Sequence, residues 1–186
     1  LADTEDTWHQ QFQRLGGVAR MGYPMSRRFE WDGFTTQVFQ KAVFQWRPDA
    51  GQVVFVNVFD QMAQAGKDEW LASEKATPRP LDGGSFDAGK GWGDVVAGRK
   101  ALLDANPAIA AAYYSASDPM TLYGLPASQV VDNGNHYSIR LQRAVIQQWK
   151  IDVPWAQAGQ ATIANGGEVA VQAGMFGGDI LAPENP

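Results

Sequence analysis

The sequence lacks cysteine, long apolar runs and an excess of basic residues, and each absence excludes a class of protein. Without cysteine the chain cannot form disulfides, thiolate active sites, iron–sulfur clusters or Cys-ligated zinc sites. No apolar run approaches the roughly 18 residues that a membrane-spanning helix needs, so we expect no transmembrane segment. The chain carries 15 Lys and Arg against 20 Asp and Glu, a formal charge of −5, and we therefore expect no nucleic-acid partner.

The composition that is present suits a folded protein with a substantial core. Of the 186 residues, 45% are hydrophobic, and seven Trp, nine Phe and five Tyr supply bulky apolar side chains. Disordered chains lack such residues, so we expect a single compact domain over residues 1–186. The chain begins at Leu1, and the Ala-Asp-Thr-Glu that follows is typical of a processed mature protein. We therefore expect an extracytoplasmic location, either secreted or at the cell surface.

An internal repeat is the clearest pattern in the chain. Residues 22–46 align without gaps with residues 124–148, at a constant spacing of 102. The positions that are identical in both copies are, in the first copy, Gly22, Pro24, Ser26, Gln40, Ala42, Val43 and Gln45. Average residue usage would give roughly one or two identities over such a stretch. The hairpin turns Asp32-Gly33 and Asn133-Gly134 are one residue out of step, which predicts a bulge or a different turn in one copy.

Periodicity and turn residues predict helices followed by strands in both copies. For the first copy we expect a helix over 4–15, a turn over 22–26 and strands over 27–31 and 34–46, and after it a further strand over 52–59. In the second copy, Asn106 before Pro107 is typical of a helix N-terminus. The Pro- and Gly-rich residues 77–93 predict a long loop between the copies.

Two copies are too few for a solenoid, so we expect them to pack as a pair on a common core. The predicted fold class is α+β, with two pseudo-symmetric helix–turn–β-hairpin units in one compact body. In this interpretation the chain consists of copy one (4–50), an elaboration (51–105), copy two (106–152) and a Gly-rich tail (153–186).

Two motifs suggest phosphate or metal binding but fail in detail. Residues 84–91 fit the start of a P-loop, yet Gly91 stands where Ser or Thr would hold magnesium, and Asp87 would repel phosphates. The acidic residues of the same loop do not follow the EF-hand pattern. The two histidines, His9 and His136, show no zinc-ligand spacing. We therefore expect no metal and no cofactor.

Signatures of catalysis are equally weak, and we expect no catalytic residue. No G-x-S-x-G nucleophile elbow is present, and the duplicated Ser26 and Ser128 suit a structural role in their turns. An alternative hypothesis is an envelope polysaccharide hydrolase with two carboxylates. Its candidates are Glu30, Asp32, Asp60, Asp68 and Glu69.

Aromatic and glutamine side chains in and beside the repeated hairpins are the best candidates for a binding site. Aromatic faces next to amide groups suit sugar rings, but the general burial of aromatic residues favours a core position for most of them. The candidate binding residues are Tyr23, Trp31, Trp46, His136 and Tyr137. Solvent exposure of the tryptophans distinguishes the two interpretations.

The stretch LGGVARMGYPMSRRFEWDGFTTQVFQKAVFQW resembles a G-x-P-x-S…D-G…Q-x-F signature of uncharacterised exported bacterial proteins. It is also similar to the LGFP repeat of cell-envelope proteins, but it lacks that repeat's regular spacing. The resemblance implies a cell-envelope location and attachment to wall polymers, and it supplies no catalytic residues.

We therefore expect a non-catalytic, exported cell-surface binding or structural module whose partner is a glycan or a cell-surface protein. The second hypothesis is the two-carboxylate hydrolase. The third is an accessory subunit that docks on a larger surface or membrane complex, for which a large exposed apolar patch would be evidence.

Overall fold

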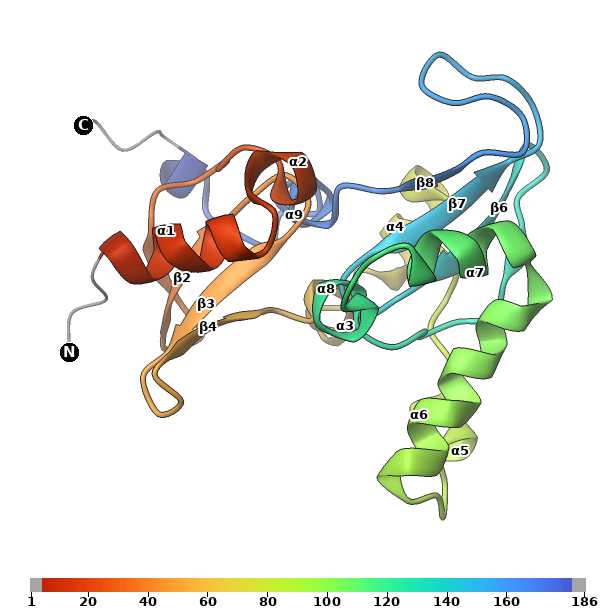
Figure 1. The fold of residues 1–186 in the computed structure, drawn as a ribbon, viewed down its shortest axis with the longest axis horizontal. Coiled ribbons are helices and arrows are strands. Elements are labelled where there is room, and N and C mark those ends of the chain that lie inside the picture. Colours follow the sequence, from red (N-terminus) through yellow and green to blue (C-terminus); the bar gives the residue numbers. More distant parts are fainter. Residues whose placement is uncertain (1–4, 182–186) are drawn as a thin grey trace. The chain divides into compact units, whose positions relative to one another are not determined.

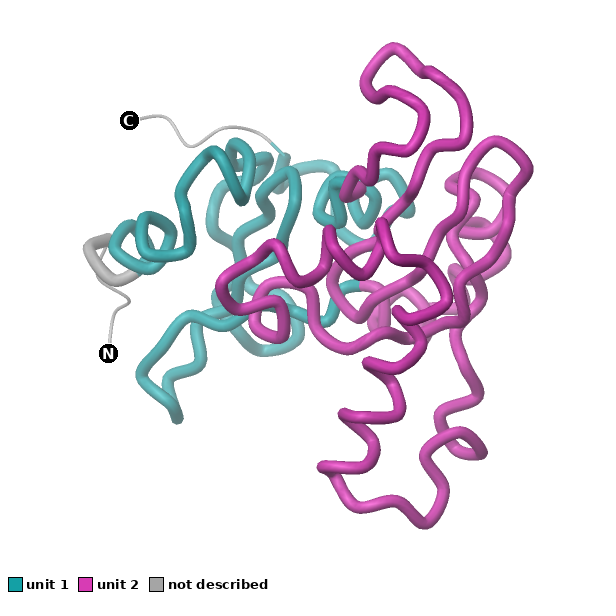
Figure 2. Tube along the Cα trace, turned by 45° about the vertical axis from the view of Figure 1, so that its right-hand side comes forward, with its two compact units in different colours: residues 1–58, 165–186 teal, residues 59–164 magenta. Residues whose placement is uncertain are grey.

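The chain forms two compact units, each built around one four-stranded antiparallel sheet (Figures 1 and 2). The computed structural model describes residues 5–181. Unit 1 comprises residues 1–58 and 165–186, and unit 2 comprises residues 59–164. The expected α+β class is confirmed. That the two units form a single pseudo-symmetric body stays a prediction.

Unit 1 has the strand order β1-β2-β3-β4, with helix α1 on one face of the sheet. On that face, the rings of Trp8 and Phe44 lie 6.3 Å apart and those of Phe12 and Phe39 lie 5.2 Å apart. The elements of unit 1 are α1 (Glu5–Arg14), α2 (Gly17–Met21), β1 (Phe29–Trp31), β2 (Phe34–Val38), β3 (Val43–Arg47), β4 (Gln52–Phe55), α9 (Gly166–Gln172) and the 3₁₀ helix η2 (Gly178–Leu181).

Unit 2 has the strand order β5-β6-β7-β8, with helix α7 on one face. Ile109 and Tyr113 of α7 are fully buried with Ile139 and Ile146 of the sheet. The strands of unit 2 are β5 (Val131–Asp132), β6 (His136–Arg140), β7 (Val145–Trp149) and β8 (Ala161–Ile163). Its helices are α3 (Val58–Gln64), α4 (Asp68–Lys75), α5 (Gly83–Phe86), α6 (Trp92–Lys100), the 3₁₀ helix η1 (Ala101–Ala105), α7 (Pro107–Tyr114) and α8 (Pro119–Tyr123). The long loop expected over 77–93 therefore contains a short helix.

The local structure of the two units corresponds at the spacing of 102 seen in the sequence. The helices α1 and α7 begin 102 residues apart, as do α2 and α8 and the first three strands of each sheet. The strand register also corresponds, since Phe29 pairs with Thr36 and Val131 pairs with Ser138. The hairpins differ in turn type rather than by a bulge. Both Asp32 and Gly33 have positive φ, whereas Gly134 alone does so in the second turn.

The repeated Gly and Gln form one structural device in each unit. The side-chain Oε1 of Gln40 accepts a hydrogen bond from the Tyr23 amide at 2.9 Å, and Gln142 does the same for Leu125 at 3.0 Å. The glycine of each turn has a φ of 72°, and a Cβ atom there would lie within 2.8 Å of the glutamine side chain. Glycine is therefore required for both the backbone conformation and the space.

The repeated serines complete the turn. The Oγ of Ser26 accepts from the amide of Val38, and the Oγ of Ser128 accepts from the amide of Arg140, both at 2.9 Å. Both serines are buried. The structural role expected for this pair is thus confirmed by corresponding hydrogen bonds.

The correspondence continues past the third strand at a larger spacing of 108. Helix α3 (Val58–Gln64) and helix α9 (Gly166–Gln172) are equal in length and begin 108 residues apart. Both end in a glycine of nearly equal φ, 71° at Gly66 and 72° at Gly174. Six additional residues (108 − 102) therefore lie in the loop between β7 and β8.

Each of these helices belongs to the unit whose sheet does not lie immediately before it in the chain. Helix α3 follows β4 of unit 1 but belongs to unit 2, where the Phe59 amide donates to the Gln142 carbonyl at 3.1 Å. Helix α9 follows β8 of unit 2 but belongs to unit 1, where the Glu168 amide donates to the Gln40 carbonyl at 2.9 Å. We call α3 and α9 the exchanged helices. Each lies against the repeated glutamine turn of the unit that it completes.

Gly167 allows α9 to approach the first sheet closely. A Cβ atom at this position would lie 1.9 Å from the carbonyl oxygen of Phe39 and 3.0 Å from that of Ala42. Backbone atoms cannot move aside as a flexible side chain can, so any other residue would push the helix away.

We predict that Gly167→Ala destabilises the protein by about 1–3 kcal/mol, the usual range for overpacking a tight site. The matched control is Gly178→Ala in the same segment, where an added Cβ would meet no atom within 4 Å. Chemical denaturation of both variants measures the difference. Equal stability of the two variants would contradict the close approach of α9.

Candidate functional site

The candidate residues of unit 1 are not brought together. Tyr23 is 65% exposed on the repeated turn. Trp31 is half-buried and packs edge-on against Phe176 at 5.1 Å, on the face that α9 and η2 cover. Trp46 is half-buried on the opposite face, which it shares with Phe44. These positions give Trp31 and Trp46 a packing role.

The candidate residues of unit 2 lie side by side at one end of β6. His136 and Tyr137 are consecutive, so their side chains point to opposite faces of the sheet. His136 is buried and its ring lies 4.9 Å from that of Trp149, its partner across the strands. Tyr137 is half-buried. This end of the sheet is the candidate site, and we call it the end surface.

The contacts of His136 assign it the neutral imidazole form. Its Nδ1 donates to Oδ1 of Asn135 at 2.7 Å, and amide nitrogens of Asn133 and Gln147 donate to Nε2 at 3.3 Å. A second proton, on Nε2, would point at these two N–H donors, which disfavours the charged imidazolium form. Burial is the main cause that lowers the pKa of His136 below its usual value, opposed by the carboxylate of Asp132. His136 is therefore a structural support of the end surface.

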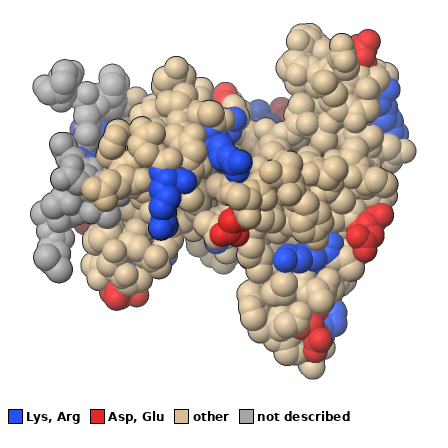
Figure 3. All heavy atoms as spheres, viewed as in Figure 1, with Lys and Arg blue, Asp and Glu red and all other residues tan. Residues whose placement is uncertain are grey.

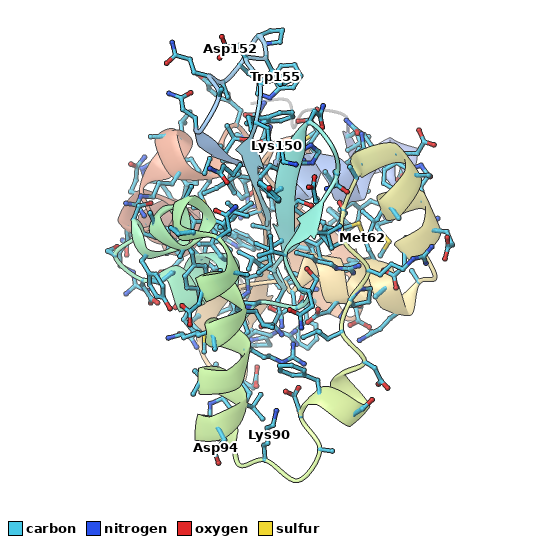
Figure 4. The ribbon with its side chains drawn as sticks, turned by 90° about the vertical axis from the view of Figure 1, so that its right-hand side faces the viewer. Met62, Lys90, Asp94, Lys150, Asp152 and Trp155 are labelled. Carbon is cyan, nitrogen blue, oxygen red and sulfur yellow. The ribbon has the colours of Figure 1, made fainter. Side chains whose placement is uncertain are left out.

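Trp155 presents an exposed ring on this support. It packs edge-on against Trp149 with ring centroids 5.5 Å apart, and 66% of the residue remains exposed. The indole nitrogen of Trp149 in turn donates to the Thr162 hydroxyl at 2.9 Å. The rings of His136, Trp149 and Trp155 thus form a continuous row of contacts from the buried side of the sheet to solvent. Figure 4 shows Trp155 and Asp152 at the tip of unit 2.

The loop that carries Trp155 is held by its own hydrogen bonds. Residues Val153 and Ala156 form a two-way backbone bridge at 2.8 and 3.2 Å. The Asp152 carboxylate accepts from the Ala158 amide at 2.8 Å, and the Gly159 amide donates to the Trp149 carbonyl at 2.7 Å. Trp155 is therefore presented in a fixed position, which reduces the entropy cost of binding.

Tyr137 lines a groove of about 580 Å³ on the other face of the sheet. The groove is also bordered by Asn106, Val130, Asp132 and Gln148. The Lys150 ammonium lies 4.1 Å from the centre of the Tyr137 ring and 2.5 Å from an Asp132 oxygen. This ion pair lowers the pKa of Asp132 and raises that of Lys150. The groove thus combines an aromatic ring, amides and a fixed pair of opposite charges.

Sequence reasoning singled out His136 and Tyr137, which lie at the end surface, but it did not single out Trp155. The feature of the sequence that could have indicated Trp155 is the six-residue increase in repeat spacing. These additional residues lengthen the loop that carries Trp155 relative to the corresponding loop of the first copy. Of the seven tryptophans only Trp92 and Trp155 are mostly exposed, and Trp92 is 70% exposed. Lys90 and Asp94, which flank Trp92 in sequence, lie at the opposite end of unit 2 from Trp155 (Figure 4).

The carboxylates considered for hydrolysis are dispersed. Asp68 forms an ion pair with Arg140 at 2.7 Å, and Glu69 forms one with Arg79. Glu30 and Asp32 are exposed on the first hairpin of unit 1. Asp60 lines a pocket, which lies in unit 2.

In the described part of the chain, basic side chains are dispersed over the surface shown and potential metal ligands do not cluster. In the view of Figure 3, uncharged surface separates the Lys and Arg side chains. Within residues 5–181 there is no group of three or more acidic or histidine side chains that could hold a metal ion. No helix in this range has the length and apolarity needed to cross a membrane.

We predict that acidification destabilises the native protein partly through His136. Because the folded state lowers its pKa, the neutral form is favoured in the fold, and the associated stability is lost as the pH falls below the unfolded value near 6.5. His136→Gln, which cannot titrate, should lose less melting temperature between about pH 7.5 and pH 5 than the natural protein. The exposed His9 provides the control, His9→Gln. An equal loss in all three proteins would contradict the assignment.

No protein-family model matches the chain, and neither does any curated protein or solved structure. Any functional assignment therefore has to rest on the chemistry of the surfaces themselves.

Proposed function

We propose that the chain is a non-catalytic, exported cell-surface binding module and that the end surface of unit 2 binds a glycan. The observation that carries the proposal is the exposed ring of Trp155, held edge-on against Trp149 by a well-bonded loop. A large aromatic ring that is ordered yet exposed has no role in the core of unit 2.

The surroundings of Trp155 favour a sugar. Sugar rings offer C–H faces that stack on aromatic rings and hydroxyl groups that need hydrogen-bond partners. The exposed polar side chains of Asp152, Gln157 and Gln160 lie in the same loop as Trp155. A loop with these residues can contact both the face and the edge of a sugar ring.

The groove beside Tyr137 extends the same chemistry. Asn106 and Gln148 are joined by a hydrogen bond of 2.6 Å, so their amides are positioned before any ligand arrives. Tyr137 lies near the start of β6 and Trp155 follows the end of β7, so both lie at the same end of the antiparallel sheet, and an extended polymer that passes this end can contact both. A chain of several sugar units fits this arrangement better than a single one.

The exported location rests on the sequence and on the resemblance of residues 15–46 to exported bacterial proteins. A wall or surface polysaccharide is then the class of glycan that such a module would meet. A partner protein is the alternative ligand, and the exposed Ile151, four residues before Trp155, is the feature that would favour it.

We predict that Trp155→Ala lowers affinity for an insoluble polysaccharide at least about tenfold, because loss of one aromatic platform removes on the order of 1.4 kcal/mol. Tyr137→Ala should weaken binding to a smaller extent. Co-sedimentation with peptidoglycan, chitin and cellulose measures the effect.

The matched control is Tyr114→Ala, which removes an aromatic ring that is 53% exposed on α7 and lies outside the end surface. This variant should bind as the natural protein does. Retention of full binding by Trp155→Ala, or no binding of the natural protein to any of the three polymers, would reject the proposal.

A further inference from the structure

A second pocket lies in unit 2, away from the end surface, where the segment 77–100 folds over the repeated turn. We call it the α6 pocket. The Leu81 amide donates to the Ala127 carbonyl at 2.7 Å, and Arg99 of α6 donates to the Pro126 carbonyl at 3.3 Å. These contacts enclose a cavity of about 260 Å³ whose polar lining residues are Asp60, Asp87, Arg99 and Gln142. The segment has no counterpart in unit 1, where Tyr23 of the equivalent turn is exposed.

One hydrogen-bond acceptor of the α6 pocket lacks a donor. The Nε and Nη2 atoms of Arg99 both bind Oδ2 of Asp87, at 3.0 and 2.5 Å, and Nη1 binds the Pro126 carbonyl. Three of the five N–H groups of the guanidinium thus bind protein atoms, and none of these three bonds is to Oδ1 of Asp87. Oδ1 of Asp87 is buried and has no hydrogen-bond partner among the described residues. A buried acceptor of this kind needs a donor.

Asp60 adds a second carboxylate to the same cavity. Its Oδ2 accepts from the Gln142 amide at 3.0 Å. Burial raises the pKa of Asp60, while the Gln142 hydrogen bond and the charges of three arginines oppose this shift. The carboxylates of Asp60 and Asp87 are the two anionic groups that line the cavity, beside the guanidinium of Arg99. A positively charged group that donates hydrogen bonds would suit these two carboxylates.

Trp92 supplies an aromatic wall at the opening. It lines the cavity while 70% of the residue is exposed. An exposed indole face attracts an ammonium group and also packs on the apolar face of a sugar-like ring. Anionic acceptors on the inside and an aromatic ring at the opening match a small hydroxylated amine.

We propose that the α6 pocket binds a small ligand that carries a primary ammonium group beside hydroxyl groups, an amino sugar being the simplest example. The ammonium group donates to Asp60 and to the unpartnered oxygen of Asp87, and the ring of Trp92 packs on the ligand's apolar face. This site is separate from the glycan-binding end surface and does not depend on it.

The experiment compares glucosamine with N-acetylglucosamine, in which acetylation removes the positive charge. Titration of the full chain near pH 6.5 by isothermal titration calorimetry should show saturable binding of glucosamine and at least about tenfold weaker binding of N-acetylglucosamine. Asp60→Asn and Trp92→Ala should each weaken glucosamine binding about tenfold. Because Trp92 is exposed, its removal leaves the fold intact and keeps the test valid if Asp60→Asn does not fold.

Two control variants test whether glucosamine binds in the α6 pocket. Asp94→Asn removes an exposed carboxylate of α6 that does not line the pocket, and Trp155→Ala alters only the end surface; both should bind glucosamine as the natural protein does. Equal binding of the two sugars, no binding of glucosamine, or no effect of Asp60→Asn and Trp92→Ala would overturn the proposal. In that case the remaining oxygen of Asp87, Oδ1, accepts a hydrogen bond from water instead of from a ligand. Loss of polysaccharide binding in Trp155→Ala has no bearing on this result, so the two proposals fail independently.

Discussion

Each four-stranded sheet has two faces to bury. In each unit, one face is covered by a helix that directly follows the sheet of the other unit in the chain. In unit 1, Phe176 of the segment after α9 contacts Phe29 and Trp31. In unit 2, the segment that begins with α3 contacts Arg140 and Ser138 of the sheet. An uncovered sheet face would expose apolar and half-satisfied polar groups to water. Residues 1–58 alone therefore do not complete unit 1, which takes helix α9 from beyond unit 2 in the chain.

The same scaffold carries different chemistry on its two covered faces. In unit 1 the face carries aromatic side chains beside the buried polar side chains of Thr36 and Gln45. In unit 2 the position equivalent to Val38 is Arg140, which is 1% exposed and binds Asp68 and the Phe59 carbonyl. A buried ion pair adds little net stability, but it penalises any arrangement that separates its members. Arg140 and Asp68 therefore favour one placement of the α3–α4 segment, which in turn positions Asp60 beside Gln142.

The sequence was sufficient for the shared parts of the two units. The duplicated Gly, Gln and Ser predicted a common turn because each fulfils a backbone requirement that few residues can meet. Helix α9 and strand β8 were not predicted, since at the changed spacing only scattered identities remain, such as Asn57 with Asn165 and Gln64 with Gln172. The sequence also did not show which tryptophan side chains are exposed to solvent. Trp149 and Trp155 look alike in the sequence, yet one is buried and the other faces solvent, because a cross-strand partner exists for only one of them.

The exchanged helices also limit how an architecture of this kind can be divided. Each copy gives away one helix and needs one in return, and within this chain the two exchanges balance. A chain cut back to one copy would carry a helix whose sheet is missing and a sheet with one bare face, and it would aggregate through that face. Such a single copy would be compatible with solubility only if a second chain supplied the missing helix.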